Sequence, residues 1–347
     1  MATMTAAFYD GNGKMELHDH PRPTAGPGQA VIRIRACGIC GTDLQMNVDK
    51  DAPDAQPAGH EVAGEVIEFG DGVDPGLLGQ RVAVESVGLA RMCGTCWFCR
   101  QGQFRACRNP APAVGGGFAD YMVRNATAFC PMPDELSWDE GALVEPFAVS
   151  IHGVRRGYLS AGETVAVLGS GTIGLMAIAG ARAMGAGKII ATARYERQAA
   201  MAKALGADEA VSDSGPEFRA AIDECTDGRG ADLTIETIGG HGGETVQQSL
   251  DVTRVLGRIV ILGGHRRPIT LDYILPLRAE HSIIFSNCYS VIDGRHDYEL
   301  AMEMMASGQA DIEQVVSHRY PLAQIQDAFD TASDKSSGSV KVQIQQD

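Results

Sequence analysis

Basic residues, aromatic residues and long apolar runs are all scarce in this 347-residue chain. Lys and Arg number 29 against 44 Asp and Glu, which gives a formal net charge of −15, and aromatic residues make up only 6%. Because affinity for nucleic acid comes largely from Lys and Arg that neutralise phosphates, this balance argues against a nucleic-acid partner. It favours a cytoplasmic protein.

Targeting and membrane-spanning segments are also missing from the pattern. Residues 1–10 show no basic stretch followed by an apolar one, so we expect no secretory signal. The longest uncharged run, residues 164–181, approaches the length of a membrane span. Its glycines and its strand-turn-helix pattern predict a buried βα unit instead, so we expect no membrane partner. The chain length suits two domains.

Cysteines, in contrast, are clustered. There are nine, and without an export signal they predict metal ligation rather than disulfides. Cys93, Cys96, Cys99 and Cys107 lie within fifteen residues, a spacing that can close a tetrahedral site and predicts a structural zinc. A zinc ribbon that binds nucleic acid is the rival interpretation, and the acidic balance weighs against it.

A second group of metal-ligand residues lies upstream of these cysteines. Cys37 and Cys40 are followed, twenty residues past Cys40, by His60. Cys and His are typical zinc ligands, and a catalytic zinc keeps about three protein ligands so that one position stays open. We interpret Cys37 as a small core residue, and Cys40 and His60 as ligands.

The hydrophobic pattern changes along the chain. Short strands separated by Gly/Pro-rich turns are predicted at 5–9, 29–36, 61–69 and 81–85, which indicates a β-rich domain. Buried strands alternating with helices are predicted at 164–168, 188–193, 208–211, 231–236, 257–262 and 281–287, which indicates an α/β fold with a doubly wound parallel sheet. The chain then returns to the first domain. The predicted boundaries are 1–150 with 290–347, and 151–289.

A glycine-rich turn connects the first of these buried strands to a helix. Gly169, Gly171 and Gly174 have the G-x-G-x-x-G spacing, with Thr172 and Ile173 at the start of the helix. In such a turn the backbone N–H groups approach a pyrophosphate at the helix N-terminus. The turn therefore predicts a dinucleotide site.

Together these motifs resemble those of the zinc-dependent medium-chain dehydrogenases/reductases. The resemblance covers essentially the whole chain and rests on Cys40-Gly-Thr42-Asp43, Gly59-His60-Glu61-x-x-Gly64, the four cysteines, residues 116–121, Glu145-Pro146 and the glycine turn. Residues 142–146 look like the polyol and threonine dehydrogenase branch. The resemblance implies a GroES-like catalytic domain, a Rossmann domain, and hydride transfer between a nicotinamide cofactor and an alcohol or ketone in a cleft between them.

The resemblance also implies roles for individual residues. Cys40 and His60 would ligate the catalytic zinc, and Glu145 stands where simple alcohol dehydrogenases place a second cysteine ligand. Glu61 is a ligand in polyol dehydrogenase relatives and a swinging alternative ligand elsewhere in the family, and the sequence leaves open which of Glu61 and Glu145 binds zinc at rest. A salt-bridge role is the alternative for Glu61. Thr42 stands where a hydroxyl accepts the substrate proton. Gln45 departs from the family, because many relatives carry a proton-relaying histidine there and glutamine cannot titrate.

Cofactor preference is set near the end of the second buried strand. The resemblance places the position that is acidic in NAD-dependent relatives at Ala193, followed by Arg194, with Arg197 nearby. A missing carboxylate removes repulsion of a 2′-phosphate, and a guanidinium can bind that phosphate. This pattern predicts NADP(H) rather than NAD(H). Pairing of the two arginines with Glu196 on a solvated face is the alternative.

The substrate is less defined by the sequence. Gln45, Phe118 and Tyr121 are candidates for the substrate pocket, and packing against the zinc is equally possible for the two aromatic residues. Sorbitol dehydrogenases carry an Arg-Tyr pair where Ser286 and Asn287 follow Phe285, which disfavours sorbitol but leaves other polyols, hydroxy acids and secondary alcohols open. A homodimer or homotetramer follows from the resemblance alone. The alternatives are an NAD-dependent polyol or hydroxy-acid dehydrogenase, a zinc-ribbon sensor with a non-catalytic dinucleotide domain, and an internal redox enzyme such as a dismutase.

Overall fold

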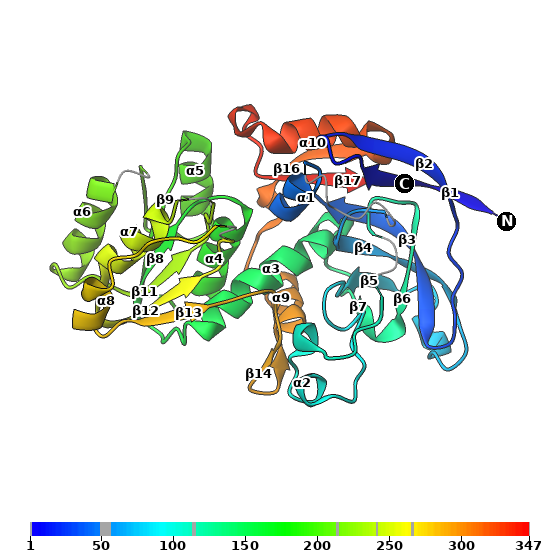
Figure 1. Ribbon diagram of the computed structural model, residues 1–347, viewed down its shortest axis with the longest axis horizontal. Coiled ribbons are helices and arrows are strands. Elements are labelled where there is room, and N and C mark those ends of the chain that lie inside the picture. The colour runs from blue at the N-terminus through cyan, green and yellow to red at the C-terminus, as the bar shows by residue number, and fades with distance from the viewer. Residues whose placement is uncertain are drawn as a thin grey trace. The chain divides into compact units, whose positions relative to one another are not determined.

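The computed structural model describes residues 2–48, 57–112, 116–212, 215–240, 242–264 and 267–346. The chain divides into two compact units (Figure 1). The first unit comprises Met1–Glu145, Ser290–Ala306 and Val316–Asp347, and the second comprises Pro146–Tyr289 and Ser307–Val315. The division falls within the longest helix, α3 (Trp138–Arg156).

The first unit is built on a mixed sheet. Its strand order is β16 (Val316–Pro321), β17 (Lys341–Gln345), β3 (Gln29–Gly38), β4 (Glu61–Phe69), β5 (Arg81–Val84) and β7 (Phe129–Pro131), with β6 (Tyr121–Asn125) also paired to β3. Two antiparallel pairs accompany it, β1 (Thr3–Tyr9) with β2 (Met15–Pro21) and β14 (Val291–Ile292) with β15 (Arg295–His296). The helices are α1 (Gly41–Met46), α2 (Trp97–Arg100), α9 (Asp297–Ala306) and α10 (Ile325–Ser333).

Helix α10 closes the core of this unit. Its apolar residues recur at helical spacing, and Ile325, Ala328, Phe329 and Ala332 are all buried. They pack with the inward-facing residues of β1, β3 and β4 in one hydrophobic cluster. Residues of β3, β4 and β17 all belong to this core, which holds the three strands in a fixed register.

The second unit contains a six-stranded parallel sheet. The strand order is β10 (Glu209–Val211), β9 (Lys188–Thr192), β8 (Thr164–Leu168), β11 (Ala231–Glu236), β12 (Thr253–Ile261) and β13 (Ser282–Phe285). Numbered within the unit this is the order 3-2-1-4-5-6, which is that of a dinucleotide-binding fold. Its helices are α4 (Thr172–Ala183), α5 (Glu196–Ala204), α6 (Gly215–Thr226), α7 (Glu244–Val252) and α8 (Ile274–Arg278).

Helices cover both faces of this parallel sheet. On one face, Phe218 and Ile222 of α6 pack against Ala166 and Leu168 of β8, and α7 packs on the same face of β12. On the other face, Gly157, just after α3, lies against Leu233 of β11. Because both faces are buried, the strands are nearly continuous apolar runs. None of the helices in the described ranges has the length and hydropathy of a membrane span.

Candidate active site

Three potential metal ligands converge at the start of helix α1 and of strand β4. Cys40 precedes α1 directly, and His60 and Glu61 lie at the beginning of β4. One ligand atom from each of the three lies within 4.8 Å of the others. The structure therefore brings together the thiol, imidazole and carboxylate that zinc binds, and it places Cys37 in the buried core instead.

Asp43 links two of these residues. It is the third residue of α1, and its Oδ2 accepts a hydrogen bond of 2.8 Å from the backbone N–H of Cys40, which fixes the start of the helix. Its Oδ1 accepts from the Tyr9 hydroxyl at 2.7 Å and lies 3.5 Å from His60 Nδ1. Burial by itself would lower the pKa of His60, but Asp43 raises it well above its ordinary value. A carboxylate on the second ring nitrogen orients a metal-binding histidine.

Glu61 is held by a lysine at the other end of the sequence. Lys341 Nζ donates to both carboxylate oxygens of Glu61, at 2.7 and 2.6 Å, and to the carbonyl of Ile39 at 3.0 Å. Both side chains are almost fully buried. Burial would lower the pKa of Lys341, but the Glu61 carboxylate and the Cys40 sulfur raise it above its ordinary value. The lysine is therefore charged, and sequence reasoning missed it.

Glu145 lies near this group without belonging to it. It is 5% exposed on α3 and is not one of the three residues whose ligand atoms converge. Burial raises its pKa to about 7, with His60 opposing the shift and Glu61 adding to it. A buried carboxylate of this kind lacks sufficient counter-charge, and a divalent cation beside it would supply that charge. Its chemistry thus fits a metal ligand.

Thr42 and Gln45 lie on α1 and are exposed to solvent. Thr42 is in the first turn, two residues past Cys40, and Gln45 follows three residues later on the same side of the helix. A hydroxyl and an amide that are both accessible can contact a bound molecule. Neither carries a charge that titrates.

The four downstream cysteines also form a cluster. The sulfurs of Cys93, Cys96, Cys99 and Cys107 lie within 4.8 Å of one another. The separations are 4.0 Å for Cys93–Cys99 and 3.5 Å for Cys96–Cys99, close to the roughly 3.8 Å edge of a zinc–thiolate tetrahedron and far from a disulfide. A hydrogen bond from Thr95 lowers the pKa of Cys93 to about 5, which favours the thiolate that ligates metal.

The glycine turn joins β8 to α4 in the second unit. Gly169 has a φ of +96°, in the left-handed region, and a Cβ at Gly174 would lie 1.8 Å from the carbonyl oxygen of Gly169. Thr172 and Ile173 form the first turn of α4, whose N-cap is Gly171. Among the described residues, no atom lies within 4 Å of a Cβ at Gly171, so packing within that part of the chain does not require glycine there. A glycine at this place in a G-x-G-x-x-G turn leaves room for the close approach of a pyrophosphate.

The end of strand β9 adjoins this turn. Thr192 Oγ1 accepts a 2.8 Å hydrogen bond from Gly169 N–H, and the carbonyl of Thr192 accepts one from the Ser170 hydroxyl. Ala193 follows and is buried, whereas Arg194 is exposed, as is Arg197 in the first turn of α5. The residue that follows Ala193 at the end of β9 is thus an exposed arginine and not an acidic residue.

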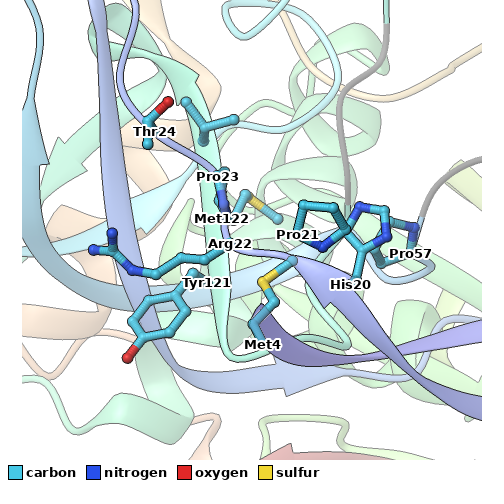
Figure 2. Close-up of a pocket in the computed structure, with 10 residues that line it drawn as sticks. Met4, His20, Pro21, Arg22, Pro23, Thr24, Pro57, Tyr121 and Met122 are labelled. Carbon is cyan, nitrogen blue, oxygen red and sulfur yellow. The ribbon is translucent and has the colours of Figure 1, made fainter. Parts of the chain in front are cut away.

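The aromatic residues predicted for the pocket wall lie elsewhere. Phe118 is 0% exposed, packs edge-on against Phe329 and lies against Gly59, so it is a core residue and the expectation for it is wrong. Tyr121 lines a surface pocket of about 330 Å³ with Arg22, whose guanidinium lies 4.9 Å from the ring centroid (Figure 2). None of the predicted metal ligands lines that pocket.

Comparison with known proteins identifies the family of this chain. Residues 26–134 match the alcohol dehydrogenase GroES-like domain, and residues 172–307 match the zinc-binding dehydrogenase family. The sorbitol dehydrogenase of Bacillus subtilis is 33% identical over an alignment of 353 positions, gaps included, which covers 98% of this chain and 97% of the relative. The chain belongs to the zinc-dependent medium-chain dehydrogenases. This family membership confirms the GroES-like and Rossmann folds expected from the motifs.

Other members of this dehydrogenase family extend the comparison. The L-threonine 3-dehydrogenase of Pyrococcus horikoshii is 30% identical over 318 residues and covers 88% of either chain. The solved structure of a Sinorhizobium meliloti protein bound to NADP has a TM-score of 0.86 and 29% identity, and the match covers 100% of both chains. The similarity to this dehydrogenase family therefore spans both units of the chain.

Proposed function

We propose that this chain is a zinc-dependent dehydrogenase that exchanges a hydride between NADP(H) and a secondary alcohol or polyol, or the corresponding ketone. The observation that carries the proposal is the convergence of Cys40, His60 and Glu61 in a chain that also holds a glycine turn of the dinucleotide type. Sorbitol and L-threonine, named for two relatives, both carry a secondary hydroxyl group, which supports this substrate class.

The side chains around the proposed zinc would have three roles: ligating the metal, orienting a ligand and accepting a proton. Cys40 and His60, with Glu145 or Glu61 as a third ligand, would hold the metal, and Asp43 orients His60. Zinc bound there would act as a Lewis acid that lowers the pKa of a substrate hydroxyl. Thr42, accessible on α1, would accept the hydroxyl proton. Gln45 cannot accept that proton from Thr42, so the proton would leave through water or a cofactor hydroxyl.

The four cysteines would hold a second, structural zinc. Four protein ligands leave no position for substrate, so this metal stabilises the loop between β5 and β6 rather than taking part in the reaction. We therefore propose two zinc ions per chain. Metal analysis of the purified protein by atomic emission would give that ratio.

The preference for NADP(H) rests on the end of β9. Ala193 offers no carboxylate to a ribose 2′-hydroxyl, and Arg194 is exposed beside the glycine turn. Hydrogen bonds to charged groups contribute about 1.5–3 kcal/mol. Replacing Arg194 by alanine should therefore lower kcat/KM for NADP(H) by roughly 10- to 100-fold and leave that for NAD(H) nearly unchanged.

Steady-state kinetics with both cofactors test this preference. A panel of secondary alcohols, polyols and ketones would first be screened at the nicotinamide absorbance to find a substrate. Arg219→Ala is the matched control, because Arg219 is an exposed arginine of the same unit that pairs with Asp223 on α6. A kcat/KM for NADH equal to or above that for NADPH in the unaltered protein would refute the preference.

We also infer a homo-oligomer formed through the second unit. Strand β13 lies at the edge of the parallel sheet, and large apolar side chains are exposed on or near it and on α8. They are Val255, Leu256, Tyr273, Leu277 and Phe285, the last being 74% exposed. An apolar edge of this kind is usually covered in a soluble assembly. Sedimentation of wild type and Phe285→Glu would distinguish a dimer or tetramer from a monomer.

A further inference from the structure

The loop that follows strand β11 is held by a buried carboxylate. Glu236 is the last residue of β11 and is 0% exposed. Its Oε1 accepts hydrogen bonds of 2.9 Å from the backbone N–H groups of Ile238 and Gly239, and one of 2.8 Å from the Thr245 hydroxyl in the first turn of α7. A carboxylate makes stronger hydrogen bonds than a neutral oxygen. The loop 237–240 is therefore fixed to the end of its own strand.

Glycines beside Glu236 leave the space that this arrangement needs. A Cβ at Gly263, just past strand β12, would lie 2.4 Å from Glu236 Oε2 and 2.2 Å from the backbone nitrogen of Gly239. Gly239 and Gly240 have φ values of +64° and +105°, in the left-handed region that favours glycine. The N–H of Gly240 donates to the carbonyl of Gly264 at 3.0 Å. The loops after β11 and β12 are thus packed together at the carboxyl edge of the sheet.

The same loop is bonded to the glycine turn. The Thr237 hydroxyl donates to the carbonyls of Leu168 and Gly169, at 2.8 and 3.3 Å. Ile238 follows, and a Cβ at Gly169 would lie 2.6 Å from Ile238 Cγ1. Strands β8 and β11 are the neighbours at which the strand order reverses, the place where such a sheet binds its ligand. Ile238 is 48% exposed there, which leaves an apolar surface that a bound dinucleotide would cover.

We propose that Glu236 is a positioning residue for the dinucleotide cofactor. It holds the loop 237–240 so that Thr237 and Ile238 lie against the glycine turn and form one side of the cofactor site. This inference rests on the proposed function, because that function requires the cofactor. Glu236 is fully buried and does not reach the cofactor itself. Without its carboxylate, two loop N–H groups lose their acceptor and the glycines allow other conformations.

NADPH affinity of Glu236 variants tests the proposal. Glu236→Met keeps an unbranched side chain of similar length and offers no oxygen acceptor. If the loop then adopts its binding conformation in about a tenth of the molecules, the dissociation constant rises about tenfold, because apparent affinity scales with the competent fraction. We expect a rise of at least this size in a titration of NADPH fluorescence. Glu236→Gln should bind within about threefold of wild type, since the amide oxygen can accept the same hydrogen bonds.

Thr245→Val is the matched control. It removes a hydrogen bond to the same carboxylate oxygen but leaves the two bonds from the loop intact. It should lower the thermal unfolding temperature and leave NADPH affinity within about threefold of wild type. Equal losses of affinity in Thr245→Val and Glu236→Met would overturn the inference, as would a Glu236→Gln variant that binds as weakly as Glu236→Met.

A purely structural role for Glu236 predicts a different titration. A variant that misfolds in part binds fewer equivalents of NADPH with an unchanged dissociation constant, and that result would also overturn the inference. Should Glu236→Met not fold at all, Thr237→Val decides, because it removes the hydroxyl through which the loop is bonded to the glycine turn. It should weaken NADPH binding about tenfold, and wild-type affinity would refute the positioning role.

The unaltered protein separates this inference from the proposed function. If it binds neither NADPH nor NADH, the proposed function fails before any variant is compared. If it binds NADPH and Glu236→Met binds equally tightly, only the role of Glu236 fails.

Discussion

Alanine should affect different properties at two glycines of the same turn: stability at Gly174 and cofactor affinity at Gly171. At Gly174 a Cβ would lie 1.8 Å from the carbonyl oxygen of Gly169 and 2.8 Å from its carbonyl carbon, whereas real Cβ contacts stay above 3.0 Å. The turn and helix α4 would have to separate by about 1.2 Å. Overpacking in a core typically costs about 1–3 kcal/mol, and a backbone neighbour cannot rotate away. We expect Gly174→Ala to lose at least about 2 kcal/mol of unfolding free energy.

Gly171→Ala is the matched control for that loss. Gly171 has an ordinary φ of −80°, and no atom of the residues that the structure describes lies within 4 Å of the added Cβ. Stability should therefore stay the same or rise slightly. The added methyl would instead occupy the space through which a pyrophosphate approaches, so NADPH should bind at least tenfold more weakly, a loss of about 1.4 kcal/mol.

Urea unfolding and titration of NADPH fluorescence measure the two effects separately. The reasoning is refuted if Gly171→Ala binds NADPH as tightly as wild type, because the glycine would then have no ligand to make room for. An unchanged urea midpoint for Gly174→Ala would refute the packing argument. Both variants losing stability equally would show that the turn tolerates no side chain, whatever binds there.

Three further outcomes follow from the first unit. Thr42→Val should keep both zinc ions by metal analysis but lose most of its turnover; near-normal turnover would remove Thr42 from the proton path. Tyr9→Phe removes the hydroxyl that holds Asp43 and should weaken zinc binding roughly tenfold in chelator competition, whereas Tyr320→Phe, which loses an equivalent 2.8 Å bond to Thr331, should not. In protein stripped of catalytic zinc, the pKa of Glu145 is raised from 4.5 to about 7, so the folded state binds more protons than the unfolded state in that interval. The contribution of Glu145 to the unfolding free energy should therefore fall by about 3 kcal/mol as pH rises from 4.5 to 7, measured as the difference between wild type and Glu145→Gln, and equal slopes for the two proteins would contradict this assignment.

The parts of the fold that follow local rules could be predicted from the sequence. Strands β8 and β11 coincide with the predicted residues because buried parallel strands are continuous apolar runs. Strand β2 was missed, since Met15–Pro21 is mostly polar and exposed. Helix α3 was missed because it contains Pro146 and is buried on most sides, which leaves no apolar stripe at helical spacing.

In the site, too, residues in local motifs could be predicted, and residues whose partners are distant in sequence could not. Cys40, His60 and the four cysteines could be recognised because ligand type and spacing carry the chemistry. Lys341 and Tyr9 could not, because their partners are 280 and 34 positions away and meet them only through the strand register and the packing of β1. Phe118 was misplaced because an aromatic residue after two glycines reads equally well as core or as pocket wall.

The ladder of β17, β3 and β4 also has a consequence for how the protein folds. Strand β17 is the last strand of the sheet in chain order, yet it carries the only ammonium that meets Glu61 in the described residues. Contacts between residues so distant in sequence form late, since closing the intervening loop costs entropy first. Until β17 docks, Glu61 lacks the two hydrogen bonds from Lys341. A zinc ion that binds during that interval would meet a Glu61 carboxylate that is not yet bonded to Lys341. The order in which β17 docks and zinc binds should therefore affect which residues ligate the first zinc.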